Sequence, residues 1–177
     1  MDHLLNRLAE LMRQHNLPAL LIGGHAVTAH GHPRATFDVD LVVPRGEADR
    51  WVEALDELGY RVGERNRNFI QLENSVFYGT PPIDFMLVEK EVFQRLDRWK
   101  SGKGVIPVPS VEAIIAMKLH AIRQPAREDV EKDWGDVMAL IRLHGLTLDA
   151  DAFSAMVMKH GGKEGYEKIR RELAGGD

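Results

Sequence analysis

The chain has 177 residues, of which 44% are hydrophobic, so it can bury a core and does not have the composition of a disordered protein. It contains no cysteine, which excludes thiol catalysis, disulfides and cysteine-based zinc sites and fits a reducing cytoplasm. The net charge of −4 argues against a general polyanion binder, and without a signal peptide or a long apolar run we expect a cytoplasmic protein with no membrane partner.

The first part of the chain alternates predicted helices and short strands. Leucines at helical spacing predict an amphipathic helix over 2–16, and a short apolar run predicts a strand over 19–22. The elements expected next are a helix over 24–30, a strand over 38–43, a helix over 47–58, short strands over 60–64, 67–72 and 75–79, a strand over 83–88 and a helix over 90–97. A last strand or an edge segment is expected over 105–108. These elements predict an α/β core over residues 1–108.

The composition changes after this core. Ser110 is a plausible N-cap for a helix over 111–123. Further helices are expected over 128–143, 150–159 and 164–173. We therefore predict an α+β fold, in which a mixed sheet flanked by helices is followed by a helical region, 109–177, packed on the core.

Two aspartates stand at the start of a strand that is otherwise apolar. Asp38 and Asp40 share one face of the predicted strand, roughly 7 Å apart, because side chains alternate along a strand. Two carboxylates on one face repel each other and lose solvation, so a divalent cation between them is the simplest explanation. The alternative is a pair of turn or capping residues at the strand end.

A glycine pair lies upstream, between the strand over 19–22 and the following helix. Gly23 and Gly24 allow a close approach of backbone to ligand, and a helix N-terminus offers free N–H groups, so this arrangement favours a phosphate. His25 follows as a phosphate donor or merely as the first residue of the helix. A tight turn without a ligand is the alternative for the glycines.

These motifs together resemble a known group of proteins. The matching residues are Gly23-Gly24-His25-Ala26, the run from Gly31 to Val43 that contains Asp38 and Asp40, the later Asp84, the Lys118-Leu119 pair, Arg127, and the segment from Lys132 to Val137. The chain from about residue 18 to 143 resembles the DNA polymerase β-like nucleotidyltransferase superfamily. Within it, the chain is similar to the minimal bacterial branch that includes AbiEii-type toxin nucleotidyltransferases.

The resemblance implies a metal-dependent nucleotidyl transfer. Asp38, Asp40 and Asp84 would hold Mg²⁺ or Mn²⁺, and Asp84 would serve the attacking hydroxyl as metal ligand or proton acceptor. Gly23 and Gly24 would cradle the triphosphate of the NTP. Many members have Ser or Thr where this chain has His25, so His25 would have to replace a hydroxyl contact.

Other residues are assigned less directly. Arg34 would bind phosphate or pair with an aspartate, and Thr36 is interpreted as a turn residue. Lys118, on an apolar helical face, would neutralise the triphosphate, unless it is a surface lysine. Asp133 shares a helix face with Asp136 and would orient Lys118 or touch the base or sugar, unless the face is merely solvated.

The resulting hypothesis is an enzyme that moves NMP from an NTP to a hydroxyl acceptor, which would be RNA such as tRNA, a protein or a small molecule. A toxin with an antitoxin partner is one form of this hypothesis. The alternatives are a non-catalytic nucleotide- or protein-binding module with the same fold and a metal-dependent phosphohydrolase.

Overall fold

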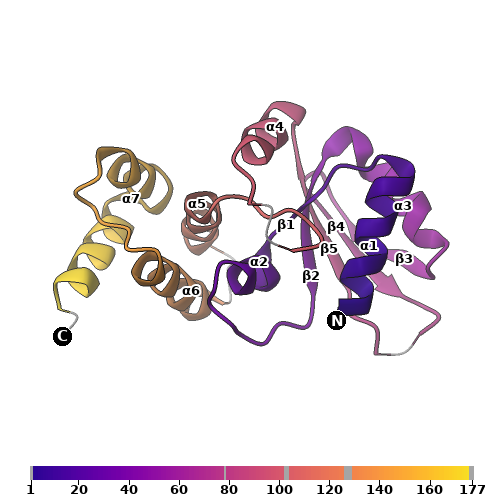
Figure 1. The fold of residues 1–177 in the computed structure, drawn as a ribbon, viewed down its shortest axis with the longest axis horizontal. Helices are drawn as coiled ribbons and strands as arrows, with labels where there is room; N and C mark the ends of the chain where they lie inside the picture. Colours follow the sequence, from indigo (N-terminus) through magenta and orange to yellow (C-terminus); the bar gives the residue numbers. More distant parts are fainter. Residues whose placement is uncertain (1, 78, 102–103, 126–128, 176–177) are drawn as a thin grey trace. The chain divides into compact units, whose positions relative to one another are not determined.

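The structure, a computed structural model, describes residues 2–77, 79–101, 104–125 and 129–175 (Figure 1). The contacts between residues divide the chain into two compact units. The first holds Met1–Ala29 and Pro33–Ser110, and the second holds His30–His32 and Val111–Asp177. In the described ranges, no helix is long and apolar enough to cross a membrane.

The first unit is a mixed α/β unit. Its elements are α1 (Asp2–His15), β1 (Leu20–Leu21), α2 (Gly23–Ala29), β2 (Val39–Pro44), the 3-10 helix η1 (Arg45–Glu47), α3 (Ala48–Asp56), β3 (Tyr60–Arg65), β4 (Phe69–Asn74), β5 (Ile83–Val88) and α4 (Lys90–Arg98). The sequence-predicted fold class is therefore confirmed.

The strands form one sheet in the order β1-β2-β5-β4-β3. Strands β2 and β5 are parallel, whereas the other neighbouring pairs are antiparallel. The register of the parallel pair places Leu41 opposite Phe85 and Asp40 opposite Asp84. Because side chains alternate, the apolar pair and the acidic pair lie on opposite faces of the sheet.

The apolar face of the sheet carries the core of the first unit. Helices α1 and α3 lie side by side (Figure 1), and Arg50 of α3 donates to the carbonyl of His15 at 2.7 Å. Trp51 of α3 is fully buried, and its ring meets the Phe85 ring edge to face at 5.7 Å. Its indole N–H donates to the Pro18 carbonyl, so this buried polar atom is satisfied.

The predicted strand over 75–79 is wrong for the residues that the structure describes, which exclude residue 78. After β4 the Asn74 side chain accepts hydrogen bonds from the backbone N–H groups of Val76 and Phe77, so the chain turns instead of extending. Residues 105–108 also form no regular strand: Val108 pairs with Ser101 in an isolated bridge, and the Pro107 carbonyl accepts from Leu21.

The second unit is helical. It contains α5 (Val111–Ile122), α6 (Val130–Leu143) and α7 (Asp151–Ala174). Helix α7 is broken at Gly162, whose φ of 67° and ψ of −174° are not helical. It therefore consists of two helical segments, which correspond to the helices expected over 150–159 and 164–173. Gly161 packs closely on Leu119 of α5. A β-carbon at this position would lie only 3.3 Å from the leucine side chain, which leaves little room for a larger residue.

Candidate functional site

Three carboxylates of the first unit converge on the acidic face of the sheet. Asp38 immediately precedes β2, Asp40 lies within it, and Asp84 lies directly opposite on β5. One oxygen of each carboxylate lies within 4.8 Å of the others, and all three side chains are partly exposed. We call these residues the carboxylate trio.

Asp84 is the trio member whose environment is most perturbed. Burial raises the pKa of Asp84, the Asp38 charge raises it further, and hydrogen bonding by Gln71 lowers it. Its Oδ1 atom is buried without a hydrogen-bond partner among the described residues. Hard divalent cations prefer carboxylate oxygens, so a cluster of three carboxylates that includes an orphaned oxygen fits such an ion.

Asp38 is held by a neighbour in its own loop. The Thr36 hydroxyl donates a hydrogen bond to Asp38 Oδ1 at 2.7 Å. The hydrogen bond is partly buried and charge-assisted, which makes it stronger than a neutral one. Thr36, interpreted from the sequence as a turn residue, is therefore also a partner of the carboxylate trio.

The glycine turn, Gly23-Gly24, lies against the carboxylate trio. Gly23 has a φ of +60°, and a β-carbon there would lie 1.8 Å from Asp40 Oδ2. A β-carbon at Gly24 would lie 2.6 Å from Thr36 Cβ and 2.9 Å from Arg34 Cζ. Only glycine fits this approach, and the turn therefore places backbone directly beside the carboxylates.

His25 and Arg34 border the same place. Burial lowers the pKa of His25, while the charge of Asp38 and a backbone hydrogen bond of Asp38 raise it. The Nε2 atom of His25 is buried without a hydrogen-bond partner in the part of the chain that the structure describes. Arg34 donates to the Ala35 carbonyl at 3.1 Å, next to Gly24. Two groups able to donate to an anion thus flank the glycine turn.

Lys118, Asp133 and Asp136 form a separate buried cluster in the second unit, which we call the lysine cluster. Lys118 Nζ lies 2.8 Å from Asp133 Oδ1 and 2.6 Å from Asp136 Oδ2. The exposed fractions of the three residues are 8%, 1% and 2%. Lys118 is thus no surface lysine, and the aspartates are not on a solvated face. Arg127, which the resemblance includes, lies outside the described residues.

Sequence reasoning missed Gln71. It lies on β4 opposite Asp84, on the acidic face, because β4 and β5 pair in that register. No local motif marks it, since its position depends on the pairing of two strands whose register the sequence pattern did not specify. Asp136 was expected to share the face of Asp133, but its direct ion pair with Lys118 was not.

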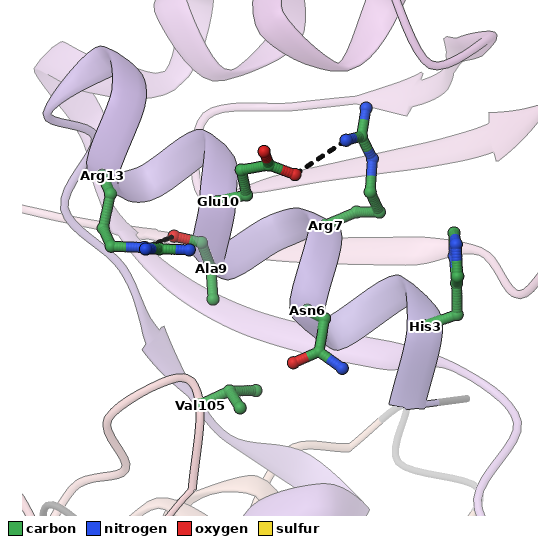
Figure 2. Close-up of a pocket in the computed structure, with 7 residues that line it drawn as sticks. All are labelled: His3, Asn6, Arg7, Ala9, Glu10, Arg13 and Val105. Atoms are coloured by element: carbon green, nitrogen blue, oxygen red, sulfur yellow. Dashed lines mark hydrogen bonds and ion pairs between the residues drawn. The ribbon is translucent and has the colours of Figure 1, made fainter.

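A hollow of about 500 Å³ on α1 contains none of the predicted site residues (Figure 2). Its lining residues are His3, Asn6, Arg7, Ala9, Glu10, Arg13 and Val105. Arg7 and Glu10 pair with each other at 2.7 Å, and Arg13 donates to the Ala9 carbonyl, as the dashed lines in Figure 2 show. These pairings occupy both arginines and the glutamate of the hollow, and its lining holds one carboxylate where the carboxylate trio has three.

Comparison with known proteins agrees with this geometry. A family model described as "Nucleotidyl transferase AbiEii toxin, Type IV TA system" matches residues 7–175. No curated protein matches the sequence.

Solved nucleotidyltransferases have a similar fold. The structure of ANT(2")-Ia in complex with adenylyl-2"-tobramycin is 19% identical, with a TM-score of 0.64 over 97% of this chain and 98% of that chain. The lincomycin-bound lincosamide antibiotic adenylyltransferase LnuA is 16% identical, with a TM-score of 0.60 over 81% of this chain and 98% of that one. The Megavirus polyadenylate synthase is 13% identical, with a TM-score of 0.57 over 80% of this chain and 32% of that one.

Proposed function

Because the chain belongs to the AbiEii nucleotidyltransferase family, we propose that it moves NMP from an NTP to a hydroxyl acceptor with the help of bound divalent metal ions. The observation that carries this proposal is the convergence of Asp38, Asp40 and Asp84 within 4.8 Å, beside a glycine turn. Three carboxylates this close repel one another unless a cation neutralises them, so their arrangement favours metal binding over a purely structural role.

In this proposal Asp38, Asp40 and Asp84 hold Mg²⁺ or Mn²⁺. When bound, such ions supply positive charge that stabilises the attacking and leaving oxygens of a phosphoryl displacement. Asp84 is suited to accept a proton from the acceptor hydroxyl, because burial raises the pKa of its carboxyl group toward the working pH of a general base. Its orphaned Oδ1 atom is the oxygen available for either role.

The glycine turn binds the triphosphate in this proposal. Gly23 and Gly24 open α2, so backbone N–H groups of the first helical turn are available to phosphate oxygens. His25 lies beside the turn, and its Nε2 atom, which has no partner among the described residues, can donate to phosphate when that nitrogen carries a proton. Arg34 adds positive charge beside Gly24.

In the second unit, we propose a role in nucleotide binding for Lys118 and Asp133. We assign Lys118 the role of a cation for the triphosphate, held in one position by Asp133 and Asp136. Two carboxylates restrict the lysine strongly, which suits a fixed charge better than a flexible one. A Lys118→Arg variant tests this role, because it keeps the charge but changes the geometry. Loss of NTP affinity in a folded variant supports the role, and an unchanged KM for the NTP contradicts it.

Metal-dependent NTP binding separates the enzyme from a metal-independent binding module. Calorimetry with each of the four NTPs, with and without Mg²⁺, is expected to show binding of at least one nucleotide only when the metal is present. Asp38→Asn should abolish the metal dependence, whereas Asp149→Asn, at an exposed position of the second unit, should not. Nucleotide binding of equal strength without metal would contradict the enzymatic proposal.

A toxin role is the finer form of the proposal, and it is supported by the description of the matching family model. Induced expression of the chain is expected to arrest growth, and Asp40→Asn should restore it. The acceptor is found by supplying labelled NTP with total RNA, tRNA, protein or hydroxyl-bearing small molecules, including the antibiotic classes named for the similar structures. A neighbouring co-transcribed frame that relieves the arrest would supply the antitoxin. Expression without growth arrest would argue for a non-toxic acceptor.

A further inference from the structure

The Thr36 side chain contacts both halves of the proposed site. Its hydroxyl donates to Asp38 Oδ1 at 2.7 Å, and its β-carbon lies so close to Gly24 that a methyl group on the glycine would meet it at 2.6 Å. Thr36 is thus the residue through which the glycine turn and the first metal-binding carboxylate touch. It is partly buried in a loop without regular secondary structure, so the loop itself does not fix the carboxylate.

We propose that Thr36 is a positioning residue, which fixes the Asp38 carboxylate for the metal ion and ties it to the glycine turn. The inference rests on the proposed function for the identity of the bound group. Because the hydroxyl holds Oδ1 of Asp38, the carboxylate is already ordered when the metal arrives and keeps its other lone pairs for the cation.

The hydroxyl is the part of Thr36 that matters for this role. Thr36→Val keeps the branched shape that packs on Gly24 but removes the donor, whereas Thr36→Ser keeps the donor and removes the methyl group. Loss of an outer hydrogen bond to a metal ligand costs about 10–100-fold in metal affinity. Thr28, which is exposed on α2 of the same unit, provides the matched control Thr28→Val.

The test is Mn²⁺ affinity of the full chain, measured by calorimetry without nucleotide, together with the thermal unfolding temperature of each variant. We expect Thr36→Val to bind Mn²⁺ about 10-fold or more weakly while remaining folded, and Thr36→Ser and Thr28→Val to bind it like the wild type. In an Asp38→Asn background the Thr36→Val effect should disappear, because the hydroxyl acts through Asp38.

Wild-type affinity in Thr36→Val would overturn the inference, and so would equal weakening in Thr36→Val and Thr36→Ser, which would make shape the important property. These outcomes are independent of turnover. If the wild type binds Mn²⁺ in this pattern but transfers no NMP, the proposed function fails and the role of Thr36 stands. If NMP transfer is found and Thr36→Val binds metal normally, the proposed function stands and the role of Thr36 fails.

Discussion

Asp40 and Asp84 lie directly opposite each other on the parallel strands β2 and β5, on the face of the sheet opposite to Leu41 and Phe85. Opposite positions on neighbouring strands bring side chains within about 5 Å, which is close enough for strong repulsion between two carboxylates. The chain therefore places like charges together at a point where nothing in the sheet requires a charge. This arrangement is the basis of the following predictions.

Asp40→Asn is expected to abolish NMP transfer while the protein stays folded. The amide keeps the shape of the side chain but removes one of three negative charges, so the metal loses a ligand and the metal-free trio loses repulsion. The unfolding temperature should accordingly stay the same or rise. Circular dichroism and a thermal melt, beside the activity assay, measure both effects. An active Asp40→Asn enzyme would refute the assignment of Asp40 to the metal.

Gly23→Ala is expected to damage the site although it adds a single methyl group. The methyl carbon would overlap Asp40 Oδ2 at 1.8 Å, and the left-handed backbone costs an alanine about 1–2 kcal/mol. Mn²⁺ affinity should fall and the free energy of unfolding should decrease. Gly46→Ala is the matched control, because a β-carbon at Gly46 meets nothing within 4 Å. Equal behaviour of the two variants in Mn²⁺ titrations would contradict the close approach of turn and carboxylate.

As the pH is lowered, metal affinity is expected to begin to fall at a higher pH than it would if Asp84 had the pKa of an ordinary aspartate. Burial raises the pKa of the Asp84 carboxyl above its ordinary value and so favours the protonated form. Protons then compete with the metal as pH falls through this raised pKa, and binding above it is unaffected. Mn²⁺ titrations across mildly acidic pH measure this. In Gln71→Met the competition should begin at still higher pH, because Gln71 lowers the pKa of Asp84. An unchanged pH profile in Gln71→Met would show that Gln71 does not act on Asp84.

Lys118→Met is expected to destabilise the second unit strongly. The substitution removes the ammonium group that pairs with Asp133 and Asp136, which are 1% and 2% exposed. Removing one partner of a buried ion pair costs about 3–5 kcal/mol. Denaturant unfolding followed by circular dichroism measures the loss.

A compensated variant distinguishes charge from packing in the lysine cluster. Lys118→Met combined with Asp133→Leu and Asp136→Leu removes all three buried charges, and it should recover most of the lost stability. If Lys118→Met alone unfolds at the wild-type denaturant concentration, the cluster does not contribute to stability in the way its burial implies.

The sequence predicted the carboxylate trio because the pattern there is local. Alternation along one strand places Asp38 and Asp40 together, and the apolar runs around Asp40 and Asp84 mark both as members of buried strands. Gly23 and Gly24 are also recognisable from a local pattern, because a glycine pair at the start of a helix indicates a tight turn. The two helices that flank Gly162 were also separated correctly, since the glycine interrupts the helical pattern.

Other features of the site and the fold were not predicted, because they depend on contacts that the local sequence pattern does not encode. Gln71 reaches Asp84 only through the register of β4 and β5, which no short pattern encodes. The expected strand over 75–79 failed because Val76 and Phe77 look like strand residues but are 63% and 64% exposed, and the Asn74 side chain takes their backbone N–H groups. A local side-chain hydrogen bond thus overrode the apolar pattern.

Transfer of label from α-labelled NTP is the direct test of metal-dependent NMP transfer. Wild-type chain, Mg²⁺ and each NTP are incubated with candidate acceptors, in parallel reactions with α- and γ-labelled nucleotide. The proposed nucleotidyl transfer predicts that α-label becomes attached to an acceptor only with metal, that γ-label leaves in pyrophosphate, and that Asp40→Asn abolishes both. Release of γ-label as free phosphate without transfer of α-label, or metal-independent transfer by Asp40→Asn, would contradict it.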